Sequence, residues 1–138
     1  MKREKSGIIN LSSTGALVVS NGSGHYLSTK VFDDFFSRTT GSYQKKKIDV
    51  LTVRPGRVTT PMLKNTVSMA HSSAQQTAEE IVNSLGRTDI CYGPIFHRFQ
   101  AALINAISPK IVTYFANKET ELMKNNLMGF VFADLKKK

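Results

Sequence analysis

Two segments rich in apolar and β-branched residues, separated by a helical pattern, constrain the fold of this chain most. Residues 7–11 read Gly-Ile-Ile-Asn-Leu and residues 48–53 read Ile-Asp-Val-Leu-Thr-Val, and turn-forming residues follow each run. Between them, from about Tyr26 to Tyr43, apolar residues recur at helical spacing. We expect this helix to weaken at residues 39–41, Thr-Thr-Gly, where helix propensity is poor. Because a strand–helix–strand order favours parallel pairing, the sequence predicts an α/β fold.

The rest of the chain predicts helices. Residues 62–76 have no clear period, and Thr77-Ala78-Glu79-Glu80 is a capping-box pattern that predicts a helix running towards Gly86. From Tyr92 to Phe115 the chain is dense in large apolar residues, and Pro109 should kink or divide any helix there. Two interpretations of this segment stay open, a helix pair in the core or an element lying in a membrane interface. We therefore predict a domain over residues 1–91 and an apolar, mostly helical tail over residues 92–138.

Composition excludes several classes of protein. The 138 residues are 41% hydrophobic and 21% charged, which is ordinary for a globular domain and excludes disordered and collagen-like chains. The single cysteine, Cys91, cannot form an internal disulfide. Three histidines without a neighbouring carboxylate cluster predict no metal site. Apolar runs are too short for a membrane-spanning helix, and residues 1–9 are too short for a signal peptide.

The net charge of +9 is compatible with three kinds of partner: nucleic acid, an anionic membrane surface, or a phosphate-bearing ligand. Lysine runs occur at residues 45–47 and 136–138, and neither is interleaved with aromatic residues. This distribution argues against nucleic acid. A basic protein that binds anionic membranes or nucleic acid is kept as one alternative.

Ser13, Tyr26 and Lys30 form a chemically sensible group. Tyr26 and Lys30 are four residues apart at the start of the predicted helix, so their side chains share a face. Ser13 follows the first strand, at the carboxyl edge where open α/β sheets bind ligands. A nearby ammonium favours the phenolate form of a tyrosine, and a serine hydroxyl can hold the substrate oxygen while the phenol transfers a proton. A Tyr-x-x-x-Lys pair also occurs by chance as a solvated helix pair, and serines after strands are common turn formers.

Three motifs in order resemble the short-chain dehydrogenase/reductase family. They are Gly7-Ile8-Ile9-Asn10-Leu11-Ser12-Ser13-Thr14-Gly15, then Tyr26-Leu27-Ser28-Thr29-Lys30, then Val53-Arg54-Pro55-Gly56-Arg57-Val58-Thr59-Thr60. The resemblance runs from residue 1 to about residue 93. Residues 31–38 and the apolar stretch with its proline are similar to the 17β-hydroxysteroid dehydrogenase type 12 group, whose members are very-long-chain 3-oxoacyl-CoA reductases of the endoplasmic reticulum.

The resemblance implies a role for each matching residue. Ser13 would orient the substrate carbonyl, Tyr26 would donate the proton, and Lys30 would bind the nicotinamide-ribose hydroxyls and assist Tyr26. The loop after the second strand would hold the nicotinamide side of NADPH, and its matching residues are Pro55, Gly56, Val58 and Thr60. Taken alone, this loop is an ordinary Pro-Gly turn, and Val58 is an ordinary β residue.

The chain also departs from the family pattern. The Gly-rich phosphate loop, the Asn-Asn-Ala-Gly strand and the supporting asparagine have no counterpart here. The resemblance therefore implies the carboxyl-terminal half of a Rossmann-like, doubly wound parallel sheet. The expected function is NADPH-dependent reduction of a carbonyl on a lipid-like substrate, a 3-oxoacyl-CoA or a steroid. The alternative is a non-catalytic remnant that binds a partner through its open sheet edge.

Further expectations concern partners and location. The exposed edge of the strand at residues 7–11 predicts self-association, so a homo-oligomer is expected. The segment from Tyr92 to Phe115 is expected to lie at a membrane interface rather than to span it, with the terminal lysines attracted to an anionic leaflet. The expected location is the endoplasmic reticulum membrane or the cytoplasm.

Overall fold

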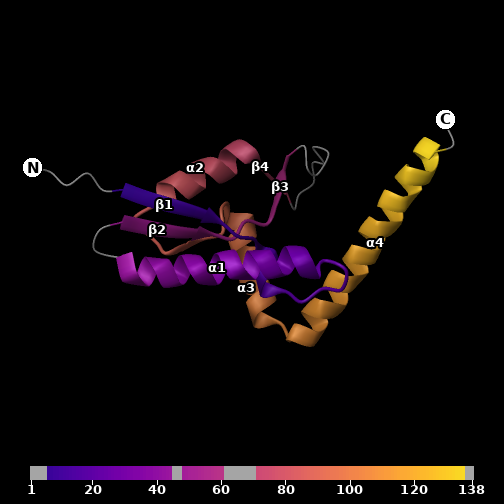
Figure 1. Cartoon of the computed structure of the whole chain (residues 1–138), viewed down its shortest axis with the longest axis horizontal. Helices are drawn as coiled ribbons and strands as arrows, with labels where there is room; N and C mark the ends of the chain where they lie inside the picture. The colour runs from indigo at the N-terminus through magenta and orange to yellow at the C-terminus, as the bar shows by residue number, and fades with distance from the viewer. Residues whose placement is uncertain (1–5, 45–47, 61–70, 136–138) are drawn as a thin grey trace, which may run out of the picture.

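The protein is a small parallel sheet with helices on both faces and a long helix running away from the body (Figure 1). The computed structural model describes residues 6–44, 48–60 and 71–135, with side chains for 6–41, 48–60 and 71–122. The elements are β1 (Ser6–Leu11), the 3₁₀ helix η1 (Thr14–Leu17), α1 (Gly24–Gln44), β2 (Ile48–Val53), β3 (Arg57–Thr59), β4 (His71–Ser73), α2 (Ala74–Ser84), β5 (Ile90–Cys91), α3 (Ile95–Ala106) and α4 (Pro109–Leu135).

The main sheet has the order β1-β2-β5, and both pairs are parallel. The pairing of β1 with β2 runs from Ser6 opposite Ile48 to Leu11 opposite Val53. The predicted α/β fold with a parallel sheet is thus confirmed. The two-residue strand β5 is a new finding, because it is too short to leave a periodic pattern in the sequence.

The residues of β2 alternate between the two covering helices. Val50 contacts α1, since a Cβ placed on Gly41 would lie 3.4 Å from the Val50 Cβ. Leu51 and Val53 are fully buried on the opposite face, where they pack with Cys91 and with side chains of α2. Because successive side chains of a strand point to opposite faces, α1 and α2 cover opposite sides of the sheet (Figure 1). This is the doubly wound arrangement that the resemblance implies.

A buried ion pair connects α1 to the end of β2. The Arg54 guanidinium donates from Nε to Asp34 Oδ1 at 2.6 Å and from Nη2 to Asp34 Oδ2 at 2.8 Å. Its third donor, Nη1, lies 3.0 Å from the Tyr92 hydroxyl. The hydrogen bond to Asp34 raises the pKa of Arg54 further, against the opposing effect of burial. The bidentate pair fixes α1 relative to the carboxyl edge of the sheet.

Helix α1 is longer and more regular than predicted. It continues through residues 39–41 to Gln44, so the expected weakening at Thr39-Thr40-Gly41 is wrong. The Thr39 hydroxyl donates to the Phe35 carbonyl at 2.8 Å within the helix. Gly41 faces Val50 of β2 at a distance where even an added Cβ would make ordinary van der Waals contact. Packing against the sheet therefore outweighs the poor local propensity.

Helix α2 begins earlier than predicted. Its N-cap is Ser73, whose hydroxyl accepts from the Gln76 N–H while the Gln76 side chain accepts from the Ser73 N–H. The capping box is therefore Ser73–Gln76, and the predicted start at Thr77 is wrong. Thr77 is buried, and its hydroxyl donates to the Ser73 carbonyl at 2.8 Å. The pairs Ser73–Gln76 and Thr77–Glu80 both fit the capping-box pattern. In the structure β4 ends at Ser73, and α2 begins directly after it.

The segment after β2 contains a second, two-stranded parallel sheet of β3 and β4. Arg57 lies opposite His71, and Thr59 lies opposite Ser73. The sequence predicted only a loop here. Of the patternless segment 62–76, residues 62–70 lie outside the described residues, and the remainder forms β4 and the first turn of α2.

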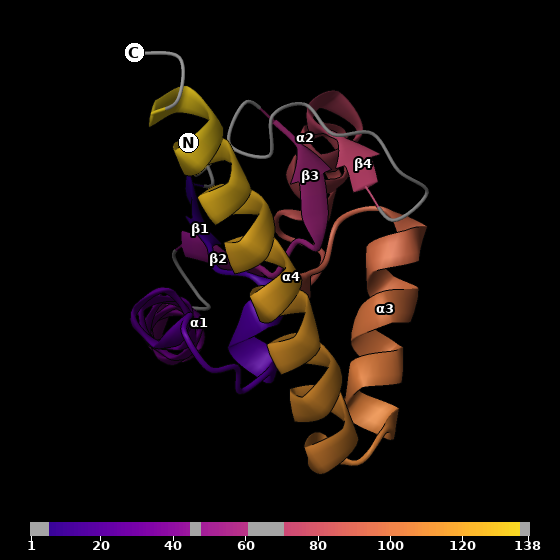
Figure 2. The ribbon, with the colours of Figure 1, turned by 90° about the vertical axis from the view of Figure 1, so that its right-hand side faces the viewer.

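Two helices, α3 and α4, follow β5 and meet at residues 107–108 (Figure 2). Pro109 is the first residue of α4, which confirms that this proline divides the apolar segment. His97 and Ala101 of α3 are buried, whereas many large apolar side chains of both helices are exposed. Within the described residues, no helix combines the length and apolarity that crossing a bilayer requires.

Candidate functional site

An apolar cleft of about 1080 Å³ lies where the carboxyl ends of the strands meet α3 and α4. Its polar end is built by residues from η1, the start of α1 and the segment after β2, and these include Ser13, Tyr26 and Val58. Its apolar walls come from α3 and α4: Leu103, Ile104, Ile107, Ile111, Val112, Phe115 and Leu122. This size and this contrast between polar end and apolar wall are typical of small-molecule sites.

Ser13 is placed by the turn that ends β1. It is the N-cap of η1, and its Oγ accepts a hydrogen bond from the Gly15 N–H at 3.0 Å. Because this bond uses an oxygen lone pair, the hydroxyl proton stays available for an acceptor in the cleft. The preceding residue, Ser12, is buried and donates to the Lys30 carbonyl at 2.6 Å, which fixes the turn against α1.

Tyr26 and Lys30 lie one turn apart in the first half of α1, as predicted. Tyr26 lines the cleft and is 47% exposed, so its hydroxyl can reach a bound ligand. Lys30 is not among the residues that line the cleft. Its Nζ donates to the Leu11 carbonyl at 2.8 Å and to Asp33 Oδ2 at 3.2 Å. The ammonium therefore lies at the end of β1, beside the cleft rather than in it.

The loop after β2 is tied directly to the Ser13 turn. The Thr14 N–H and the Thr14 hydroxyl both donate to the Pro55 carbonyl, at 3.0 and 3.2 Å. Beyond Pro55, three predicted residues line the cleft, namely Gly56, Val58 and Thr60. The structure thus brings Ser13 and Tyr26 to one cleft with most of the predicted cofactor loop. Pro55 contributes its carbonyl to the support of that loop.

Helix α4 is held over the open side of the cleft by polar contacts. The Ser20 and Thr120 hydroxyls form a hydrogen bond of 2.8 Å, and the Asn21 N–H donates to Asn117 Oδ1 at 2.7 Å. Arg57, next to the predicted loop residue Gly56, forms an ion pair with Glu119. These contacts join α4 to the connection between η1 and α1 and to β3, the segments next to the polar end of the cleft.

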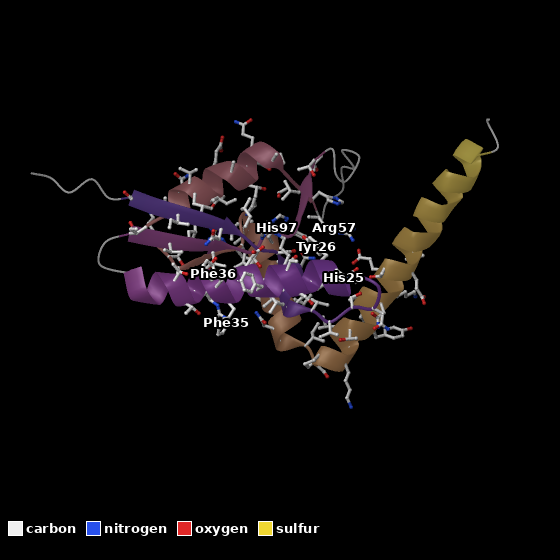
Figure 3. All side chains as sticks on the ribbon, viewed as in Figure 1. His25, Tyr26, Phe35, Phe36, Arg57 and His97 are labelled. Carbon is white, nitrogen blue, oxygen red and sulfur yellow. The ribbon has the colours of Figure 1, made fainter. Side chains whose placement is uncertain are left out.

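A buried histidine lies behind the polar end. His97 of α3 is fully buried, and its Nε2 lies 3.1 Å from the Arg57 carbonyl oxygen. In Figure 3, Tyr26, Arg57 and His97 all lie towards the carboxyl ends of the strands. Burial lowers the pKa of His97, and the nearby backbone oxygens of Arg57 and Tyr92, which favour the charged ring, oppose this effect. Gln100 lines the cleft one turn further along α3, and its Oε1 is buried without a hydrogen-bond partner among the described residues.

Sequence reasoning missed His97, Arg57 and Gln100. A lone histidine in an apolar segment carries no motif, and it contacts the loop through a backbone carbonyl that any residue provides. Among the described side chains, no three His, Cys, Asp or Glu residues gather where a metal ion could bind.

Comparison with known proteins identifies the family. A family model described as short chain dehydrogenase matches residues 1–71, which is 71 of the 138 residues and so just over half of the chain. No curated protein matches the chain.

Two solved structures are similar in fold. One is a 7β-hydroxysteroid dehydrogenase, with a TM-score of 0.71 and 16% identity, and the match covers 80% of this chain and 47% of that one. The other is a short chain dehydrogenase from Burkholderia cenocepacia J2315 in complex with NADP, with a TM-score of 0.67, 18% identity, and coverage of 80% and 48%. The chain thus spans about half the length of each solved structure. Because the family model matches more than half of the chain, the chain belongs to the short-chain dehydrogenase family.

Proposed function

We propose that the chain supplies the catalytic half of an oxidoreductase that reduces a carbonyl group on a lipid-like substrate with NADPH. One observation carries the proposal: Ser13, Tyr26 and the loop residues Gly56, Val58 and Thr60 all line one cleft. Three separate segments of the chain supply these residues at the carboxyl edge of the parallel sheet. That edge is where open α/β sheets bind their ligands.

The residues of the cleft fit a nicotinamide cofactor. The loop offers backbone groups at Val58 and a hydroxyl at Thr60, which suit a carboxamide. Nearby, the orphaned Oε1 of Gln100 is an acceptor that a ligand N–H can satisfy. A bound nicotinamide would supply the hydride for the carbonyl carbon. The NADP complex of the solved Burkholderia cenocepacia enzyme supports this choice of cofactor.

Within this proposal Ser13 and Tyr26 act on the carbonyl oxygen. Ser13 accepts from the Gly15 N–H, so it can donate its own proton to that oxygen and hold it. Tyr26, exposed in the same cleft, then gives the oxygen its proton. Lys30 would hold the ribose hydroxyls through the N–H that its bonds to the Leu11 carbonyl and the Asp33 carboxylate leave unused.

The apolar walls of the cleft favour a lipid-like substrate. Helices α3 and α4 contribute mostly aliphatic and aromatic side chains to its walls, beside the polar residues Gln100, Lys118, Glu119 and Thr120. A long acyl chain or a steroid skeleton would bury its apolar surface there at about 25 cal/mol per Å². We infer a 3-oxoacyl-CoA or a steroid, in keeping with the resemblance to the type 12 17β-hydroxysteroid dehydrogenase group. The similarity in fold to a 7β-hydroxysteroid dehydrogenase is compatible with this inference.

We further propose that α3 and the start of α4 rest on a membrane surface, at the endoplasmic reticulum. Ile95, Phe99 and Tyr114 are 78%, 64% and 64% exposed, so a large apolar area faces outward. Flotation of the chain with anionic vesicles tests this proposal. Ile95→Ser combined with Phe99→Ser should reduce the bound fraction, whereas Val82→Ser on α2 should leave it unchanged. Equal binding by all three proteins would contradict the proposal.

A second candidate function is partner binding without catalysis. It is favoured by β1, a sheet edge whose Ile8, Ile9 and Leu11 are 39%, 38% and 57% exposed. Such an edge can pair with a strand of another chain.

A turnover assay separates the two candidates. The genomic DNA immediately upstream of the first codon is translated and searched for an in-frame Thr-Gly-x-x-x-Gly-x-Gly motif. The amino-terminal half encoded there is then expressed together with the 138 residues as one polypeptide, the joined protein. It should consume NADPH in the presence of a long-chain 3-oxoacyl-CoA or a ketosteroid. Absence of the motif, or a joined protein that consumes no NADPH with either substrate, would contradict the catalytic proposal and favour partner binding.

A further inference from the structure

We propose that His97 is a positioning residue for the loop after β2: its Nε2 donates to the Arg57 carbonyl and thereby sets the orientation of the Val58 N–H. The inference rests on the proposed function in one respect, because this loop is the segment assigned to the nicotinamide. The geometry of the contact stands without that assignment.

The proton on His97 can be located from its partners. Nε2 lies 3.1 Å from the Arg57 carbonyl oxygen and 3.5 Å from Ser72 Oγ. A carbonyl oxygen only accepts, so Nε2 must carry the proton. Nδ1 has no hydrogen-bond partner among the described residues. The ring is also fully buried, which favours its neutral form.

The hydroxyl groups of Ser72 and Thr77 extend the hydrogen bonds of His97 into a network and determine which atom donates in each bond. Thr77 donates to the Ser73 carbonyl at 2.8 Å, so its oxygen is left to accept from Ser72, 2.7 Å away. Ser72 therefore gives its proton to Thr77, and its lone pair faces the same Nε2–H at 3.5 Å, as the longer and weaker branch of a bond shared with the Arg57 carbonyl. All these bonds have consistent directions only when Nε2 is the protonated nitrogen. The network connects α3 to β3, β4 and α2.

The loop backbone rests against the imidazole ring. A Cβ on Gly56 would lie 2.6 Å from His97 Cδ2 and 2.8 Å from Gln100 Oε1, so only glycine allows this approach. The peptide group between Arg57 and Val58 lies in β3 and is planar, so a bond to its carbonyl oxygen restrains the direction of its N–H, in addition to the pairing of β3 with β4. Val58 lines the cleft, and the resemblance assigns its backbone to the cofactor. His97 is thus placed to act on the ligand through the loop, without touching it.

The competing explanation is a core histidine that only fills space. Two substitutions separate the explanations. His97→Phe keeps a planar ring of similar volume but removes the donor, whereas His97→Gln keeps an N–H donor at the end of a flexible chain. Ser72→Ala is the matched control, because it removes the neighbour of His97 in the network while leaving the bond to Arg57.

Amide hydrogen exchange on the 138-residue chain gives the first readout. Loss of one hydrogen bond should speed exchange at residues 57–59 by roughly tenfold in His97→Phe, with β2 unaffected. His97→Gln should restore most of the protection, and Ser72→Ala should stay near the wild type. Equal exchange in His97→Phe and Ser72→Ala, or an equal increase across β2, would overturn the proposal. Failure of His97→Gln to protect these amides better than His97→Phe would also overturn it.

The joined enzyme gives the second readout. His97→Phe should raise the KM for NADPH by roughly tenfold while changing kcat little, and His97→Gln should recover the wild-type KM. A changed kcat with an unchanged KM would overturn the role in cofactor positioning. If the joined wild-type protein consumes no NADPH, the proposed function fails, and hydrogen exchange alone decides whether His97 positions the loop.

Discussion

Gly56 shows how one small residue sets the geometry of the polar end of the cleft. Its α-carbon lies so close to His97 and Gln100 that any Cβ would overlap atoms of both. The ring of His97 is fully buried and cannot move aside as an exposed side chain can. The position therefore requires glycine for close approach, independently of backbone conformation.

Gly56→Ala should destabilise the chain by about 1–3 kcal/mol, because a methyl group must be forced into a closely packed contact. Gly24→Ala is the matched control, since a Cβ there meets no atom within 4 Å and the residue begins α1. Thermal unfolding should show a lower Tm for Gly56→Ala and an unchanged or slightly higher Tm for Gly24→Ala. Equal Tm values for the two variants would show that the contact at Gly56 is not tight.

His97 predicts a pH dependence of stability. Burial lowers its pKa from the ordinary value of 6.5, and the charge on nearby His71 acts in the same direction. The unfolded chain then binds a proton near pH 6.5, whereas the folded chain binds it only at lower pH. The free energy of unfolding should therefore be greatest above pH 6.5 and fall as the pH drops below it.

Urea denaturation between about pH 7.5 and 5.5 measures this effect. His97→Gln should reduce the loss of stability over that range, because its side chain does not titrate. The same pH dependence in wild type and His97→Gln would assign the effect to other groups.

At the scale of elements, the buried ion pair between Asp34 and Arg54 connects α1 to β2. Asp34→Ala would leave the Arg54 guanidinium buried without its carboxylate, which should cost about 3–5 kcal/mol of stability. Asp33→Ala removes the neighbouring carboxylate, whose partly exposed pair with Lys30 should contribute about 0–1 kcal/mol. Chemical denaturation of the two variants compares them directly. A similar loss in both would contradict the assigned role of the buried pair.

The elements differ in how far the sequence predicts them. The bounds of β1 and β2 follow from their β-branched runs, and the division at Pro109 follows from the missing N–H of proline. Strands β3, β4 and β5 contain only two or three residues each, which is too few to show an alternating pattern. Segments this short become strands only when a neighbouring strand pairs with them. The sequence does not distinguish between two adjacent segments, 73–76 and 77–80, that satisfy the same capping pattern, and in the structure the N-cap is Ser73 rather than Thr77.

The residues of the candidate site also differ in whether the sequence predicts them. Ser13, Tyr26 and the loop from Pro55 to Thr60 form motifs, so the sequence predicts them together. The position of the Lys30 ammonium is not predictable from its spacing to Tyr26, because it depends on the Leu11 carbonyl and on Asp33. His97 acts through a backbone oxygen, so nothing in the pattern of side chains points to it.

At the scale of the whole molecule, the edge of β1 predicts self-association of the isolated chain. In sedimentation experiments the 138-residue chain should form oligomers rather than a monomer, because β1 exposes an apolar strand edge. Ile9→Lys should raise the monomer fraction, while Val82→Lys, the same change on the exposed face of α2, should not. A monodisperse wild-type monomer would contradict the prediction. The division of the chain between residues 1–91 and 92–138 stays a prediction.

If the Tyr26 hydroxyl passes a proton to the substrate oxygen, its removal should slow the reaction. The most direct test is the NADPH-dependent reduction rate of the joined enzyme carrying Tyr26→Phe, compared with Tyr114→Phe, which removes an exposed hydroxyl of α4 outside the cleft. Tyr26→Phe should lower kcat by roughly 10²- to 10⁴-fold with NADPH affinity largely kept, and Tyr114→Phe should leave both unchanged. Full activity in Tyr26→Phe would show that the Tyr26 hydroxyl is not the proton donor.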